Sequence, residues 1–171
     1  MDKFRFFISL CVMTSLYFIV PCDAFGQIDF KKPPKVAVHI TLIKDTVTSQ
    51  DSIRLTIKIT NTGSKIQQLL FDKPPGGVGG PWYTTGDVID LKTGQSVVQL
   101  QNRAVLSSQL YQEKDLKDKY YHLKQGQSIT STYWLTSIVV CGAGVPLPGG
   151  DYEVLINYSG NSSNKAMFHV L

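Results

Sequence analysis

Three histidines, His39, His122 and His169, are the residues of this sequence most suited to acid-base catalysis or metal binding. None has another histidine, a cysteine or a glutamate at the short spacing that zinc sites usually show. The pattern therefore favours solvent-facing or hydrogen-bonded structural histidines, and the sequence predicts no metal and no cofactor. A catalytic site assembled only in space, such as His122 with Asp118 or Cys141 with a histidine, remains the enzymatic alternative.

Short motifs of nucleophilic and phosphate-binding sites are also missing. The sequence has no Gly-x-Ser-x-Gly, the motif that exposes a serine nucleophile on a strand-to-helix turn. The glycine-rich run at 76–80 lacks the following Lys-Ser/Thr of a phosphate loop, and Pro81 stands where a helix would open. We therefore predict that the protein is not an enzyme.

Residues 1–26 have the pattern of a secretory signal peptide. Lys3 and Arg5 precede an apolar stretch at 6–20, and small residues follow it. Cleavage is expected after Ala24 or after Gly26, and the protein is expected to be secreted or to reside in the periplasm or cell envelope. The apolar stretch is shorter than the roughly 20 residues that span a bilayer, and no later segment is longer, so we expect no transmembrane segment in the mature chain.

Cysteines can report lipid anchoring and disulfides in an exported chain. Anchoring through Cys22 is disfavoured because Pro21 stands where lipoprotein signals carry a small residue. Removal of the leader takes Cys11 and Cys22 away and leaves Cys141 as a free thiol with no intramolecular partner. We expect Cys141 to be a small buried hydrophobic residue; the alternative is an exposed or intermolecularly paired thiol.

The mature chain, residues 27–171, has the size of a single domain. The full sequence has 17 basic and 13 acidic residues, a net charge of +4, and the leader removes two of each, so the mature chain keeps this charge. The basic residues are scattered, and no run of Lys or Arg exceeds two, so a nucleic-acid partner is not expected.

Period-two alternation of apolar and polar residues predicts an all-β protein. No segment sustains a helical period, although 108–121 has room for a short helix. Strands without long crossovers favour an antiparallel Greek-key sandwich of about seven or eight strands. The expected strands are 36–42, 53–60, 66–71, 87–91, 95–101, 129–135, 152–158 and 166–170, with a hairpin turn at 92–94.

The segment from Leu147 to Tyr152 resembles the tyrosine corner of Greek-key sandwiches. Leu147 lies five residues and Gly150 two residues before Tyr152, and Val154 and Ile156 continue in strand alternation. In such a corner the tyrosine hydroxyl bonds to the backbone a few residues upstream. Leu147, Gly150 and Tyr152 are therefore predicted to be structural residues.

The order of these features along 36–158 resembles a known domain type. A clean strand ends in Asn61-Thr62-Gly63, a hairpin follows at 92–94, a turn occurs at 123–128, and the tyrosine corner completes the set. This is similar to the immunoglobulin-like sandwich that precedes the catalytic domain in deuterolysin-type and lysine-specific metallopeptidases, and to related secreted bacterial sandwich domains. The peptidase signature His-Glu-x-x-His is absent. The resemblance therefore implies an immunoglobulin-like module without catalytic activity.

Two loops are candidates for function. Residues 72–86 are rich in proline and glycine and end in Pro81, Trp82 and Tyr83, whose rings are of the kind that anchor binding partners. Trp82 has the alternative of folding onto the core. The apolar connection at 137–150 either covers a sheet edge or offers a binding patch.

These features predict a secreted or periplasmic binding module without enzymatic activity. Its expected partner is another protein, with the chain acting as a protease inhibitor or as an accessory subunit. The alternative is a carbohydrate-binding module that uses exposed aromatic rings. A set of three coplanar exposed rings on one face would favour that alternative.

Overall fold

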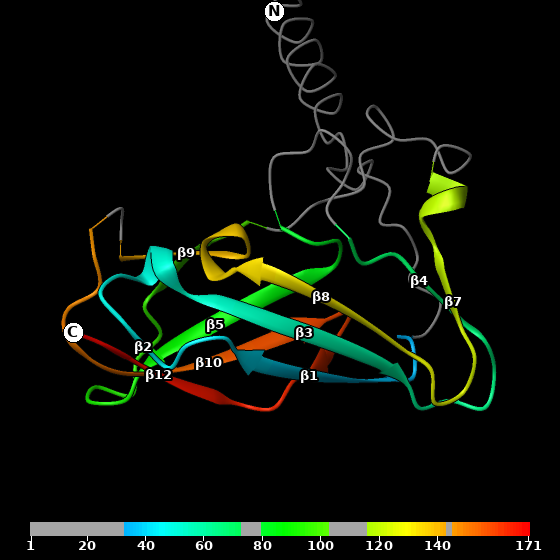
Figure 1. Ribbon diagram of the computed structural model, residues 1–171, viewed down its shortest axis with the longest axis horizontal. Coiled ribbons are helices and arrows are strands. Elements are labelled where there is room, and N and C mark those ends of the chain that lie inside the picture. The colour runs from blue at the N-terminus through cyan, green and yellow to red at the C-terminus, as the bar shows by residue number, and fades with distance from the viewer. Residues whose placement is uncertain (1–32, 73–79, 103–115, 143–144) are drawn as a thin grey trace, which may run out of the picture. The chain divides into compact units, whose positions relative to one another are not determined.

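The computed structural model describes residues 33–72, 80–102, 116–142 and 145–171. The described residues all belong to one unit, Pro33–Leu171, and the expected signal peptide lies outside them. They form strands joined by three short 3-10 helices (Figure 1). The elements are β1 (Val36–Leu42), β2 (Thr46–Val47), η2 (Gln50–Ser52), β3 (Arg54–Asn61), β4 (Gln67–Leu69), β5 (Thr84–Asp90), β6 (Val98–Gln101), η3 (Lys117–Lys119), β7 (Tyr121–Leu123), β8 (Ser128–Trp134), η4 (Leu135–Ser137), β9 (Val139–Cys141), β10 (Gly150–Tyr158), β11 (Asn161–Ser162) and β12 (Ala166–Val170).

One sheet has three antiparallel strands in the order β1-β3-β8. The central strand β3 pairs with the whole of β1 and the whole of β8 in unbroken register. Burial alternates strictly along β3, from exposed Arg54 and buried Leu55 to buried Asn61. This is the period of two that the sequence predicts for a sheet with one buried face.

The second sheet is built around β10, which pairs with β5 and β12 and, at its end, with β11. Strand β2 extends this sheet by pairing in parallel with β12. Because β2 follows β1 directly, the start of the described chain contributes to both sheets. Two small ribbons, β4-β7 and β6-β9, complete the strands. The two main sheets have the strand order of an immunoglobulin-like sandwich, so the predicted fold class is confirmed.

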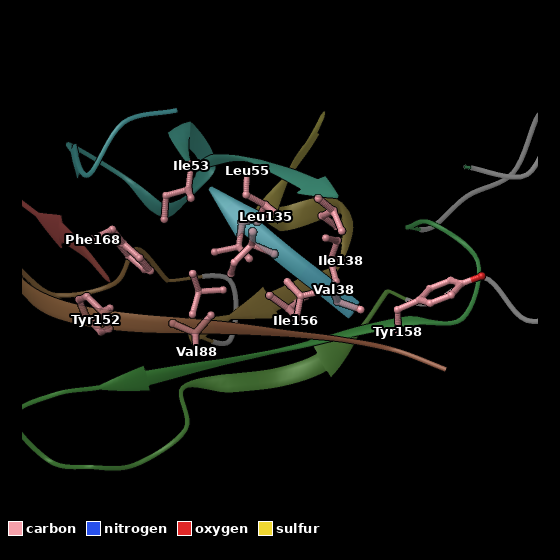
Figure 2. Packing of buried hydrophobic residues seen from close by; sticks show 14 of the residues in the cluster. Val38, Ile53, Leu55, Val88, Leu135, Ile138, Tyr152, Ile156, Tyr158 and Phe168 are labelled. Atoms are coloured by element: carbon pink, nitrogen blue, oxygen red, sulfur yellow. The ribbon is translucent and has the colours of Figure 1, made fainter. Parts of the chain in front are cut away.

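The two sheets share one hydrophobic core (Figure 2). Leu55 and Ile57 of β3 meet Val88, Val154 and Ile156 of the second sheet in this core, and all five are fully buried. Burial of apolar surface on this scale is the main stabilising contribution in a sandwich of this size.

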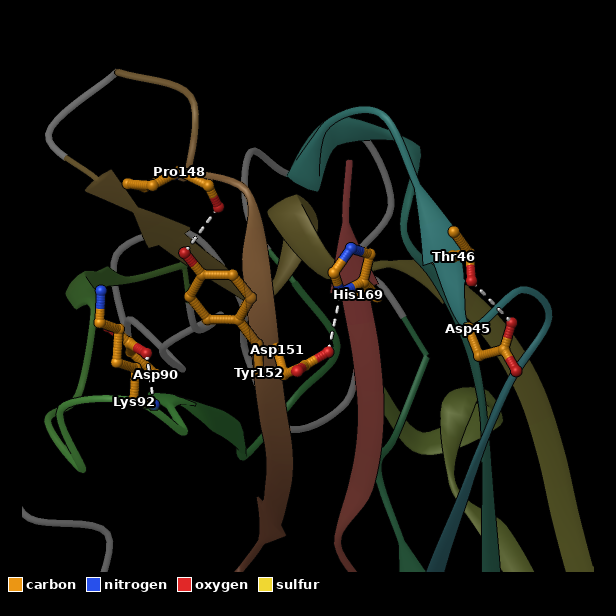
Figure 3. A network of polar contacts seen from close by, with 8 residues as sticks. All are labelled: Asp45, Thr46, Asp90, Lys92, Pro148, Asp151, Tyr152 and His169. Atoms are coloured by element: carbon orange, nitrogen blue, oxygen red, sulfur yellow. Dashed lines mark hydrogen bonds and ion pairs between the residues drawn. The ribbon is translucent and has the colours of Figure 1, made fainter.

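The tyrosine corner is present as the sequence predicts (Figure 3). The hydroxyl of Tyr152 donates a hydrogen bond of 2.8 Å to the carbonyl oxygen of Pro148. The Tyr152 ring stacks on Phe168 of β12 with 5.4 Å between ring centroids, and Leu147 is buried in the core. Gly150 is the first residue of β10. The corner therefore fixes the entry of the chain into the central strand of the second sheet.

The hairpin between 87–91 and 95–101 differs from the prediction. The turn forms. The Gly94 N–H donates to the Asp90 carbonyl at 2.8 Å, and the Asp90 N–H donates to the Gln95 carbonyl at 3.0 Å. Beyond it, however, β6 leaves β5 and pairs with β9. The side-chain amide of Gln101 then takes the place of a strand residue: it accepts from the N–H of Gly86 at 2.9 Å and donates to its C=O at 2.7 Å.

The described part of the connection at 137–150 contributes apolar side chains to the core. Ile138, Val139 and Leu147 are buried, although Val145 remains exposed. The amide of Gln50 holds this segment, accepting from the Leu147 N–H at 2.9 Å. Of the expected helical segment at 108–121, residues 108–115 lie outside the described part, and η3 is a single 3-10 turn. No helix among the described residues has the length and apolar character needed to cross a bilayer.

Candidate functional site

The three residues expected to anchor a partner lie in the protein interior or at its margin. Pro81 and Trp82 are buried, with Trp82 only 1% exposed, and Tyr83 is half-buried. Trp82 packs with Leu70 and Leu116 in a small second core. The alternative of a tryptophan folded onto the core is therefore the one observed, because burial makes its ring inaccessible to a partner. Residues 73–79 of this loop lie outside the described part.

Tyr83 occupies an unusual backbone position. It has φ of 54°, Ser159 has φ of 47°, and the N–H of Ser159 donates to the Tyr83 carbonyl at 3.0 Å. Left-handed backbone is uncommon for residues with side chains and stores local strain. Burial, followed by the neighbouring Tyr120, raises the pKa of the Tyr83 phenol to about 12. Tyr83 is thus a neutral, fixed residue at a structural corner.

Cys141 is a free, buried thiol, as expected. Burial, and then the nearby Asp87 carboxylate, raise its pKa from the ordinary 9.0 to about 11. Since the thiolate is the nucleophilic form, such a thiol is unreactive at neutral pH.

The three histidines lie on different strands or strand ends, and one of them has an acidic partner. His169 on β12 contacts Asp151 on β10, with 2.7 Å between Nδ1 and Oδ1 (Figure 3). Within the described ranges no hydrogen bond joins His122 to Asp118, and no three histidine, cysteine or acidic residues gather in a group that could hold a metal ion.

A carboxylate surrounded by hydroxyl groups is a feature that the sequence did not reveal. Asp72 accepts hydrogen bonds from the hydroxyls of Ser131 and Tyr133, each at 3.2 Å, and from that of Tyr121. The Asp72 hydrogen bond is the largest cause of a rise in the Tyr121 pKa from 10.0 to about 12. Burial and Asp72 also raise the pKa of Tyr133. Residue 72 is 49 positions from residue 121, so no short-range spacing in the sequence could predict that these side chains meet.

The outward side of the β1-β3-β8 sheet is polar and largely exposed; we call it the outer sheet face. Hydroxyl groups lie in rows across its strands. Thr56 and Thr132 are hydrogen-bonded at 3.0 Å, and Thr60 and Ser128 at 2.8 Å. The face consists of the side chains of Ala37, His39, Thr41, Arg54, Thr56, Lys58, Thr60, Ser128, Thr130, Thr132 and Trp134.

Trp134 lies at one end of this face and is 47% exposed. The guanidinium carbon of Arg54, its partner across the strands, lies 4.9 Å from the centroid of the Trp134 ring. This cation-π contact holds both long side chains in place on the surface. The sequence analysis did not select Trp134, although alternation along the strand could have placed it outward with Thr130 and Thr132.

The charges of the two outer faces differ. The strands β1, β3 and β8 contain Arg54 and Lys58 but no aspartate or glutamate. Beside the second sheet, Lys165 pairs with Glu153 of β10 at 2.8 Å. Among the described residues, neither Arg54 nor Lys58 takes part in an ion pair. Within the described residues, the outer sheet face therefore carries two cationic side chains with no ion-pair partner.

Comparisons with known proteins do not assign a family. No protein-family model matches the chain, and no curated protein matches it. Solved structures similar to it include the alkylpurine DNA glycosylase AlkC of Pseudomonas fluorescens bound to DNA containing an abasic site analogue (12% identity, TM-score 0.46, 80% of this chain and 30% of that one). A second is the β-glucosidase EmGH1 of Erythrobacter marinus (10% identity, TM-score 0.43, 80% of this chain and 15% of that one). A third is a β-glucosidase of intestinal bacteria involved in saponin metabolism (15% identity, TM-score 0.40, 81% of this chain and 16% of that one). The chain thus matches less than a third of the length of each, and none of them is a metallopeptidase.

Proposed function

We propose that this protein is an exported, non-enzymatic module that binds another protein through its outer sheet face. The observation that carries the proposal is the exposed pair of Trp134 and Arg54 on an otherwise mostly polar sheet face. Tryptophan and arginine are the residue types most enriched among those that dominate protein-protein binding energy. The roles expected from the sequence, protease inhibitor or accessory subunit, belong to this proposal.

Pre-organisation supports this assignment. Each partner of the pair restricts the other, and the central strand carrying Arg54 is hydrogen-bonded on both sides. Side chains that are already ordered lose less conformational entropy on binding. The buried Trp82 ring offers no such surface. We therefore assign partner binding to the outer sheet face instead of to Trp82 in the loop at 72–86.

Affinity capture with matched variants tests the proposal. The mature chain, a Trp134→Ala/Arg54→Ala variant and a Met167→Ala variant are each used to capture proteins from the envelope fraction of the cells that produce the chain. Met167 is a suitable control because it is 66% exposed and lies on the other sheet. We expect a partner that the wild type and Met167→Ala retain and the double variant loses. Equal retention by all three would remove the outer sheet face from the proposal.

Carbohydrate binding is the second candidate, favoured by the Trp134 ring beside rows of hydroxyl groups. In the described part of the chain, Trp134 is the single aromatic residue whose ring is largely exposed, so the three coplanar rings expected for this function are not found there. Electrophoresis through gels containing neutral or acidic polysaccharides tests it. Retardation that disappears with Trp134→Ala would favour a glycan ligand over a protein.

A further inference from the structure

Strand β8 has backbone groups directed away from β3, its one sheet partner among the described residues. At its two ends, Asn61 N–H donates to Gln127 C=O at 3.0 Å and Leu135 N–H donates to Ile53 C=O at 2.9 Å. Hydrogen-bonded pairs alternate with non-bonded pairs along an antiparallel ladder. The odd-numbered residues of β8 therefore bond to β3, and the even-numbered ones point their N–H and C=O groups to the open edge.

This edge is formed by Ser128, Thr130, Thr132 and Trp134. Among the described residues, one group bonds to it: the Ser137 hydroxyl donates to the Trp134 carbonyl at 2.6 Å. The stretch from Ser128 to Thr132 thus offers an alternating series of donors and acceptors, which an extended backbone matches.

Side-chain amides bond to single backbone positions on the edges of two other strands. The Asn164 amide bonds to both backbone groups of Ile40 on the outer side of β1. The Gln101 amide does the same to Gly86 on β5. Among the described residues, no side-chain amide meets the edge of β8 between Ser128 and Thr132 in this way.

Strand β8 also lacks the features that discourage pairing. Edge strands usually carry charges, prolines or bulges that prevent association. The seven residues of β8 include no charged residue, no proline and no glycine, and their pairing with β3 has no bulge. Five of them are threonine, isoleucine, tyrosine or tryptophan, which favour strands.

We propose that the binding partner adds an extended, acidic segment to the edge of β8 as a further strand. This inference rests on the proposed protein-binding function and specifies its mode. Backbone hydrogen bonds to Ser128, Thr130 and Thr132 provide affinity, and alternate side chains of the added strand lie beside the outer sheet face. Arg54 and Lys58 on β3 select carboxylates at those alternate positions, because the three strands of this sheet contain no acid to neutralise them.

A second copy of this chain is a poorer occupant than an acidic segment. Edge-to-edge pairing of two β8 strands would join two sheets whose only charged residues other than histidine are Arg54, Lys58 and their counterparts. Like charges brought together oppose association.

Selection from a displayed library of random ten-residue peptides tests the proposal with the mature chain as bait. We expect enriched peptides to alternate β-branched residues with aspartate or glutamate. Their affinity should fall at least tenfold for Thr130→Pro, which removes one edge N–H, and should change less than twofold for Thr130→Val, which keeps it. Proline is tolerated where an edge N–H faces solvent, and unfolding in urea verifies that the variant is folded.

A second measurement does not depend on the variant. The strongest peptide is synthesised with N-methyl groups on every second residue, in both registers. One register should abolish binding and the other preserve it, because only one edge of an added strand bonds to β8. No enriched peptide, enrichment without acids, equal effects of both registers, or dimerisation of the chain that Thr130→Pro abolishes would each overturn the proposal.

Failure of this mode can be told from failure of the binding function. Loss of the captured partner with Trp134→Ala/Arg54→Ala, but not with Thr130→Pro, would leave the function standing without strand addition. Retention by both variants would contradict both proposals.

Discussion

The side-chain amide of Asn164 binds both backbone groups of Ile40, a residue 124 positions earlier in the chain. The Ile40 N–H donates to Oδ1 at 2.8 Å, and Nδ2 donates to the Ile40 carbonyl at 3.1 Å. Asn164 lies between β11 and β12 of the second sheet, whereas Ile40 is in β1 of the first. One side chain therefore connects the two sheets by imitating a strand.

Asn164→Ala should lower the free energy of unfolding by about 1–3 kcal/mol, because Ile40 loses its two partners. Urea unfolding at pH 7 measures this. Gln99→Ala is the control, since Gln99 is an exposed amide on β6 and its removal should change stability by less than about 0.5 kcal/mol.

Asn164→Asp adds a test of the donor. A carboxylate still accepts from the Ile40 N–H but also faces the Ile40 carbonyl, so its protonated form is favoured in the folded state and its pKa is raised. The variant should then gain stability relative to wild type as the pH falls from 7 to 4. A pH-independent difference would contradict the double hydrogen bond.

Tyr152→Phe should reduce the free energy of unfolding by about 1 kcal/mol, because it removes the 2.8 Å hydrogen bond to Pro148 and keeps the stacking on Phe168. Tyr152→Leu should reduce it further, since it removes both. Unfolding in urea distinguishes the two losses. If Tyr152→Phe were as stable as wild type, the hydroxyl would have no role in the corner.

Stability should fall at alkaline pH. The pKa of Cys141 is raised from 9.0 to about 11 and that of Tyr83 from 10.0 to about 12 in the folded protein. The unfolded chain therefore releases these protons first, so their contribution is complete below pH 9 and is lost between pH 9 and 12. Thermal unfolding across this range measures the loss, and Cys141→Ala should lessen its first part, from pH 9 to 11. A flat wild-type profile would contradict the burial of these groups.

Asp72→Asn should lower the pKa of Tyr121 from about 12 toward 10.0, because the hydrogen bond to the carboxylate is the largest cause of its rise. Titration of phenolate absorbance should show one more tyrosine ionising near pH 10 to 11 than in wild type. Asp118→Asn is the control, since Asp118 is exposed in η3. Identical titration curves for the two variants would argue against the hydroxyl cluster around Asp72.

Alternation and turn residues are local signals in the sequence, and they predicted the structural features that depend on residues close together in the chain. The exposed and buried positions of β3 and the bond from Tyr152 to Pro148 follow from spacing within a few residues. Trp82 follows a proline- and glycine-rich loop without periodicity, so the sequence left open both a partner-binding and a core position for its ring. Trp134 could have been placed outward, because it continues the alternation of β8.

Contacts between distant residues could not be predicted in this way. No sequence pattern near Asp72 indicates its contacts with Tyr121 of β7 and Tyr133 of β8. The amide of Gln101 replaces ladder bonds that the hairpin pattern assigned to a continuous strand pair. Side-chain amides that imitate backbone leave no periodic trace, because their role depends on which strand edge they meet in the folded protein.

The parallel pairing of β2 with β12 has a kinetic consequence. His169 pairs with Thr46, a separation of 123 residues (169 − 46), and β12 lies between β2 and β10 in its sheet. When such distant segments come together, the chain between them loses conformational entropy before any contact compensates for it. Domains dominated by non-local pairing fold in milliseconds to seconds. During synthesis β2 cannot pair with β12 until more than a hundred further residues have been made, so we expect this edge of the second sheet to form late in folding.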